Sequence, residues 1–405
     1  MSDTLFITAG IPADNPALYR QIRFSAGDPA VLIEFPDPNL VVREARPASY
    51  RESAENPRRS VKLLILRDIE NERAAASASV DFVASPADFR PEEGLSGDRE
   101  TATAQSGAEA LRRYGAGSVT ADRTLPLIYA EMISRAGIAV RCDIERGIAE
   151  RRQKAAWEID AVRASQHTTE TVMAAACRII GSAESGADGV LLYEGSPLTS
   201  ERMRGIIDKL LLDAGFSNPE SSIVAGKKDG GDCHSLGYGP LYRNEPVIVD
   251  IFPRSRATHY FGDCTRTVVN GEIAPVYAEM LAAVSAAKRA AQQTIRPGVT
   301  GEEVHRAAVA ALEKAGFGYA APGSAEAQNE IRLTHGTGHG LGLACHEPPL
   351  LDIGGPELMT GDIVSVEPGL YSKKYGGIRV EDMVVVTPDG CENLGAPLPE
   401  TLVWR

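Results

Sequence analysis

The sequence predicts an α+β fold of the α/β type, in which helices and strands alternate through two domains. The chain has 405 residues, enough for two or three domains of about 100–200 residues each. Near residue 150, strand-like runs and polar loops give way to a long helical segment. We therefore expect one domain at residues 1–150 and a second at 151–405, the second built from two related halves.

The composition excludes several classes of protein. The 42 Lys and Arg against 55 Asp and Glu give a net charge of −13, which argues against a nucleic-acid partner. The sequence has no run of about 18 apolar residues, so we expect no membrane span, and its first residues do not resemble a signal peptide. The six cysteines never form CxxC pairs. A disulfide scaffold and a zinc knuckle are therefore unexpected, and a reducing, cytoplasmic setting fits best.

Apolar periodicity predicts the elements in order. Runs at 30–35 and 61–66 predict strands, and the polar segment 84–110 predicts a loop with one helix. Helices are predicted at 150–180, 203–211, 277–291 and 300–312. Thr300 and Glu303 form a capping box at the start of the last helix, and Gly316 ends it.

Two segments of the second domain repeat one pattern. Residues 246–271 and 362–390 each contain an apolar strand that ends in an acid, then a loop, then a second acid that opens another β-run. The acids are Asp250 and Asp263 in one segment, 13 residues apart, and Glu367 and Glu381 in the other, 14 residues apart. The pattern predicts two related halves that each contribute two carboxylates.

These acids lie in unusual surroundings. Asp250, Glu367 and Glu381 adjoin apolar runs typical of buried strands. A buried carboxylate costs several kcal/mol unless it is paired, hydrogen-bonded or bound to metal. A single acid of this kind would indicate a structural salt bridge, but three of them together with Asp263 indicate a shared cation.

Three of the seven histidines lie close together in a glycine-rich segment, HGTGHGLGLACH at 335–346. His335, His339 and His346 are separated by glycines, which allow close backbone approach to a ligand. The segment does not match GxGxxG or HExxH, and the chain has no GxSxG or P-loop motif. The triplet therefore indicates a functional site, but the motif is neither that of a nucleotide-binding loop nor that of a zinc-binding HExxH helix.

Carboxylates and an imidazole together are typical of a site for two divalent ions about 3.5–4 Å apart. Oxygen-rich ligation favours Mn²⁺, with Fe²⁺, Co²⁺ or Zn²⁺ as alternatives. Such a pair activates water and polarises a carbonyl, so the residues indicate a dinuclear metallohydrolase.

Five stretches together resemble the M24 metallopeptidase superfamily of methionine aminopeptidases, prolidases and aminopeptidase P. They are VIVD at 247–250, GDCTRT at 262–267, HGTGHGLGLACHEPP at 335–349, VEPGLY at 366–371 and GIRVED at 377–382. The resemblance covers the second domain and implies its pita-bread fold. Residues 1–150 more weakly resemble the creatinase-like N-terminal domain of the prolidase and aminopeptidase P branches, which methionine aminopeptidases lack.

The resemblance assigns five metal ligands, with two of them bridging both ions. The ligands would be Asp250, Asp263, His339, Glu367 and Glu381. Asp263 and Glu381 would bridge, and Glu367 would also take the proton from the attacking water.

The resemblance also assigns residues that touch the substrate. His346 would hydrogen-bond the substrate around the scissile peptide bond, and His234 would steady the carbonyl or the intermediate. Together with Glu367 these would be the catalytic residues. His335, Tyr371 and Arg379 would bind substrate, and Arg379 would orient its neighbours.

The implied function is an Xaa-Pro aminopeptidase, a homodimer that releases the residue before a proline from oligopeptides. Many prolidases carry an arginine that grips a dipeptide carboxylate where this chain has Leu350. A prolidase acting on Xaa-Pro dipeptides is the alternative. A metal-free creatinase-like hydrolase and an inactive binding module are also possible, but the intact ligand positions argue against both.

Overall fold

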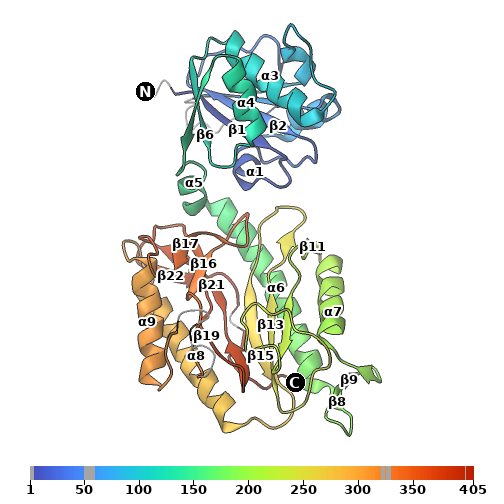
Figure 1. Cartoon of the computed structure of the whole chain (residues 1–405), viewed down its shortest axis with the longest axis vertical. Coiled ribbons are helices and arrows are strands. Elements are labelled where there is room, and N and C mark those ends of the chain that lie inside the picture. Colours follow the sequence, from blue (N-terminus) through green and yellow to red (C-terminus); the bar gives the residue numbers. More distant parts are fainter. Residues whose placement is uncertain (1–3, 50–59, 321–323, 325–329, 397) are drawn as a thin grey trace. The chain divides into compact units, whose positions relative to one another are not determined.

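The computed structural model describes residues 4–49, 60–320, 324, 330–396 and 398–405. The chain forms two compact units, Met1–Arg151 and Arg152–Arg405 (Figure 1). Among the described residues, no helix is both long and apolar enough to cross a membrane.

In the described part of the first unit, seven strands form one mixed sheet in the order β3-β5-β4-β2-β1-β6-β7. The strands are β1 (Phe6–Gly10), β2 (Ala30–Phe35), β3 (Arg46–Pro47), β4 (Val61–Leu66), β5 (Phe82–Ala84), β6 (Ser118–Asp122) and β7 (Ala139–Asp143). The helices are α1 (Pro16–Ile22), α2 (Asn71–Ser77), α3 (Arg99–Arg113) and α4 (Leu127–Arg135), with 3-10 helices η1 (Asp68–Glu70) and η2 (Pro86–Phe89).

The two strands predicted in this unit are confirmed as β2 and β4. Both have apolar side chains on each face of the sheet: Val31 and Leu63 belong to one buried cluster, and Leu32 and Leu64 belong to another. Burial on both faces explains why these strands appear in the sequence as continuous apolar runs.

The second unit contains two sets of antiparallel strands, each packed against a pair of helices (Figure 1). The first set comprises α6 (Ala156–Ser182), α7 (Ser200–Asp213), β12 (Ile223–Gly226), β13 (Pro246–Ile251) and β15 (Cys264–Val269). The second comprises α8 (Pro275–Thr294), α9 (Gly301–Lys314), β16 (Gly338–Gly340), β17 (Glu347–Leu351), β18 (Ile363–Val366), β21 (Asp382–Thr387) and β22 (Gly390–Asn393). Short elements complete the unit: β8 (Glu184–Ser185), β9 (Leu191–Tyr193), β10 (Ser196–Pro197), β11 (Phe216–Ser217), β14 (Arg254–Ser255), β19 (Gly369–Ser372) and β20 (Gly376–Arg379).

The two halves place their acids at equivalent points. In the first half, β13 pairs antiparallel with β15; Asp250 lies in β13 and Asp263 immediately precedes β15. In the second half, β18 pairs antiparallel with β21; Glu367 follows β18 and Glu381 immediately precedes β21. The repeated pattern in the sequence thus corresponds to two antiparallel strand pairs with matching carboxylates.

The helix predicted to begin at Glu150 is interrupted. A short helix, α5 (Ala149–Arg152), ends before α6 begins at Ala156. Between them, Lys154 is buried and its Nζ donates to Glu347 Oε1 at 2.9 Å. The helix is broken where this ammonium group pairs with a carboxylate of the second unit. Local periodicity does not reveal a partner so distant in the sequence.

Candidate metal centre

Asp250 and Asp263 come from the first strand set, and both are almost fully buried. Asp250 Oδ2 accepts from Arg379 Nη2 at 2.6 Å, whereas its Oδ1 has no hydrogen-bond partner among the described residues. The Gln166 side chain on α6 holds the backbone of Asp263: it accepts from the amide at 2.9 Å and donates to the carbonyl at 2.8 Å. The Asp263 carboxylate is therefore fixed from behind while its oxygens face the cavity.

Glu367 and Glu381 come from the second strand set. Glu381 Oε2 accepts from Thr265 Oγ1 at 2.8 Å, and its buried Oε1 has no partner among the described residues. Glu367 Oε1 accepts from Ser365 Oγ at 3.3 Å, and the Glu367 amide donates to the Thr337 carbonyl at 2.8 Å. Each carboxylate thus keeps at least part of its acceptor capacity for a ligand.

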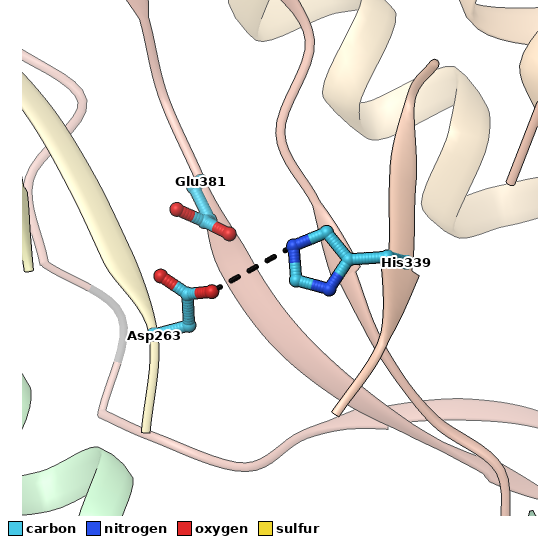
Figure 2. Close-up of side chains that lie close together, drawn as sticks. All are labelled: Asp263, His339 and Glu381. Carbon is cyan, nitrogen blue, oxygen red and sulfur yellow. Dashed lines mark ion pairs between the residues drawn. The ribbon is translucent and has the colours of Figure 1, made fainter. Parts of the chain in front are cut away.

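His339 on β16 completes the cluster. Its Nδ1 lies 3.1 Å from the Gly340 carbonyl, an acceptor, so Nδ1 carries the proton. The lone pair of Nε2 then faces Glu367 Oε1 at 3.3 Å and Asp263 Oδ2 at 3.8 Å. Figure 2 shows Asp263, His339 and Glu381 pointing toward one another; each offers one ligand atom, and these atoms lie within 4.8 Å of one another.

Glycines make room for this histidine. A Cβ on Gly338 would lie 2.0 Å from the Ser365 carbonyl oxygen, and one on Gly340 would lie 2.4 Å from the Glu347 carbonyl oxygen. Any side chain at either position would push β16 away from its neighbours. The glycine-rich pattern around His339 therefore serves close strand packing beside the cluster.

The cluster carries excess negative charge in a buried place. Burial and the neighbouring carboxylates raise the pKa values of Asp263 and Glu381 well above their ordinary range. Burial raises the pKa of Glu367 to about 7, although Arg379 opposes the shift. Burial lowers the pKa of His339, which keeps the ring neutral.

These residues fit a divalent cation. In the described part of the cluster, two buried carboxylate oxygens lack partners, and a neutral imidazole aims its lone pair at carboxylates. A cation between them would relieve the repulsion. Carboxylates with one imidazole are a hard, mostly oxygen donor set, which suits Mn²⁺ or a similar ion.

A cavity of about 330 Å³ opens onto the cluster. The predicted site residues that line it are His234, Asp250, Asp263, His335, His339, His346, Glu367, Arg379 and Glu381. The ring of His346 lies 4.1 Å from that of His339, measured between centroids.

Tyr371 is placed differently from the other predicted site residues. It is 1% exposed and lies behind the cavity wall, where its hydroxyl accepts from Arg379 Nη1 at 2.8 Å and contacts His335 Nε2 at 2.7 Å. His335 Nδ1 faces the Gly336 carbonyl at 2.6 Å, so Nε2 is the acceptor and the tyrosine donates to it. Burial lowers the pKa of His335 to about 3, which keeps this ring neutral. Tyr371 therefore positions two wall residues, and the structure does not place it on the substrate side.

Residues 160–388, more than half of the chain, match metallopeptidase family M24. The chain belongs to this family. It is 37% identical over 187 residues to the probable dipeptidase PepE of Mycobacterium tuberculosis, a match that covers 45% of this chain and 46% of the relative. It is 31% identical over 155 residues to the Xaa-Pro dipeptidase of Pyrococcus furiosus, covering 38% of this chain and 40% of the relative. The chain therefore spans less than half the length of these curated M24 relatives.

Solved structures extend the likeness over almost the whole chain. The X-Pro aminopeptidase of Thermotoga maritima has a TM-score of 0.74 at 19% identity, covering 98% of this chain and 96% of that one. The prolidase of Pyrococcus furiosus has a TM-score of 0.71 at 19% identity, covering 98% and 97%. At this identity the likeness shows the fold alone, and it confirms the predicted fold class: an N-terminal domain followed by a pita-bread domain.

Several supporting residues of this M24 member escaped the sequence analysis. Gln166 and Ser365 fix the backbone and side chains of the cluster, and Thr265 Oγ1 also accepts from Arg379 Nε at 3.2 Å. Gln166 sits in the middle of a predicted helix, where an amide gives no signal. Thr265 and Ser365 lie within predicted strands, and only the register between strands shows what they face.

Proposed function

We propose that the chain is a metal-dependent Xaa-Pro aminopeptidase that hydrolyses the bond between an N-terminal residue and a following proline. The observation that carries the proposal is the lone pair of His339 Nε2 directed at buried carboxylates of both strand sets, an arrangement that a cation between them would stabilise. The ligands in this proposal are those predicted from the sequence: Asp250, Asp263, His339, Glu367 and Glu381. Two divalent ions, with Mn²⁺ as the favoured metal, would polarise the scissile carbonyl and ease deprotonation of the attacking water.

Three side chains of the cavity would have separate roles in the hydrolysis. Glu367 would accept a proton from the attacking water and return it to the leaving proline nitrogen. Burial and the nearby His339 lower the pKa of His346, so its neutral ring can hydrogen-bond the peptide beside the cluster. His234 is exposed at the cavity and would donate to the scissile carbonyl.

Two observations bear on the length of the substrate. Among the described residues that line the cavity, Arg379 is the one lysine or arginine. Its guanidinium already donates to Asp250 and to the Tyr371 hydroxyl. A dipeptide's C-terminal carboxylate would thus meet no free cation there, which supports cleavage of longer peptides. The relatives named as dipeptidases favour the second candidate, a prolidase.

One experiment distinguishes the aminopeptidase from the prolidase. Alanine release from Ala-Pro-Ala and Ala-Pro is measured side by side after loading with Mn²⁺, with a chelator-treated sample as control. The proposal predicts a higher kcat/KM for the tripeptide. A higher kcat/KM for the dipeptide would establish the prolidase, and failure to cleave either peptide would overturn both.

A further inference from the structure

One wall of the cavity is apolar and starts at the proposed ligand Asp250. Ile223 on β12 lies directly opposite Asp250 in the strand register, so the two side chains share a face. Phe252 follows Asp250 by two residues, and alternation along the strand puts it on the same face. Ile223 and Phe252 both line the cavity. An aliphatic side chain of a bound peptide could therefore lie against this wall.

A carboxylate stands at the outer end of the wall. Glu220 precedes Ile223 by three residues, is exposed and lines the cavity. Its charge acts on Cys345 and His346 across the cavity. Within the described part of the chain, no side chain forms a hydrogen bond or ion pair with Glu220. The charge of Glu220 is therefore available to a ligand.

The other outlying carboxylate of the cavity is already engaged. Asp352 Oδ1 accepts from the Ile353 amide at 2.7 Å and lies 3.8 Å from His305 Nε2. The cavity thus offers one uncommitted carboxylate outside the metal cluster, at the end of an apolar wall. A long aliphatic chain that ends in a cation matches this combination, because its stem can be buried while its head stays hydrated beside the acid.

We propose that Glu220 selects peptides whose first residue is lysine or arginine. This inference rests on the proposed function, in which the bond that breaks joins the first residue to proline. Of the two residues that flank this bond only the first can carry a cation, and we therefore assign the side chain of the released residue to the wall formed by Ile223 and Phe252. Glu220 would act on substrate selection and would take part in no step of the hydrolysis.

The test compares two peptides that differ in one ammonium group. Lys-Pro-Ala and norleucine-Pro-Ala have side-chain stems of equal length, and kcat/KM is measured for both with the Mn²⁺-loaded full chain. We expect the wild type to prefer the lysine peptide by about two- to fivefold, the scale of a solvated charge pair, and by less at high salt. In Glu220→Gln the ratio should fall close to one because the negative charge is gone. A ratio measured within one variant is used because it cancels any general loss of activity. Asp352→Asn is the matched control and should keep the wild-type ratio.

Each outcome has a separate meaning. Glu220→Lys should reverse the order of Lys-Pro-Ala and Glu-Pro-Ala, which a merely structural role of Glu220 would not do. Equal kcat/KM for the lysine and norleucine peptides in the wild type would overturn the selection by Glu220 and leave the proposed function intact. Loss of the lysine preference in Asp352→Asn but not in Glu220→Gln would also overturn it. Failure to cleave any of these peptides would instead overturn the proposed function.

Discussion

The Tyr371 hydroxyl lies 2.7 Å from His335 Nε2 and donates to it, while accepting from Arg379. This link fixes a cavity histidine from behind and continues through Arg379 to the carboxylate of Asp250. The orientation of the cavity wall is thus tied to one side of the proposed metal centre.

Replacement of Tyr371 by phenylalanine should therefore weaken the fold around the site. Tyr371→Phe removes a buried hydroxyl that donates to His335 Nε2 and accepts from the buried Arg379, and loss of a partner by a buried polar group costs about 1–3 kcal/mol. We expect the free energy of unfolding of the metal-free protein to fall by about that amount. Tyr242→Phe, at a tyrosine that is 40% exposed, should change it by less than about 0.5 kcal/mol. Equal stability of the two variants in denaturant titrations would show that the link contributes nothing.

Glu381 should affect stability and activity in opposite directions. Burial and repulsion raise its pKa, so in the metal-free protein the charged form is unfavourable. Glu381→Gln should stabilise the metal-free protein but abolish Mn²⁺ binding and peptide hydrolysis. Calorimetric metal titration and thermal unfolding measure the two effects, with the exposed Glu313→Gln as control. A Glu381→Gln protein with full activity would remove Glu381 from the ligand set.

His346 should be separable from metal binding. Its ring lines the cavity beside His339 but is absent from the proposed ligand set. His346→Ala should keep the metal content of the wild type and lose at least about 10²-fold in kcat, the scale of a positioned catalytic group. The exposed His167→Ala on α6 serves as control. Near-normal kcat in His346→Ala would refute the catalytic role.

The stability of the metal-free protein should fall as pH rises from 6.5 to 8. The pKa of Glu367 is raised from 4.5 to about 7, and the pKa values of Asp263 and Glu381 are raised well above their ordinary values of 3.8 and 4.5, respectively. In this window the folded protein binds more protons than the unfolded chain, so the free energy of unfolding decreases with pH. The histidines whose pKa values are lowered act in the opposite direction, and this contribution fades as the pH rises through the unfolded pKa of about 6.5.

Chemical denaturation of chelator-treated protein at several pH values measures this slope. Glu381→Gln should reduce it because one of the three contributing carboxyls is gone. Saturating Mn²⁺ should remove the decrease, since a bound cation favours the charged carboxylates. A stability that rises from pH 6.5 to 8 without metal would contradict the charge balance derived for the cluster.

The parts of the fold that local pattern could predict were those with strong periodicity and clear ends. The helix that begins at Gly301 carries the predicted capping box, with Thr300 and Glu303 bonded to each other as expected. The break at Lys154 could not be predicted, because its partner Glu347 is far away in sequence. Residues 99–113 form a longer helix than the loop-rich segment suggested, since its alanines pack into the core of the first unit.

In the candidate site, too, some features could be predicted from local sequence and others depend on residues that are distant in the chain. Burial of Asp250 and Glu381 was predictable because apolar runs surround them, and the structure places both in the cavity. Glu220 gave no sequence signal, since an exposed acid in a turn is ordinary and only the cavity shows what it faces. Tyr371 was expected among substrate contacts, but its direction depends on the pairing of β19 with β20, which local sequence does not specify.

We infer that the carboxylates and His339 bind metal that Xaa-Pro hydrolysis requires. The most direct test measures bound Mn²⁺ per chain and alanine release from Ala-Pro-Ala on the same samples: as loaded, after chelation and after restoring Mn²⁺. We expect about two ions per chain when loaded, loss of both metal and activity on chelation, and recovery of both together. Undiminished alanine release from fully metal-depleted protein would contradict it.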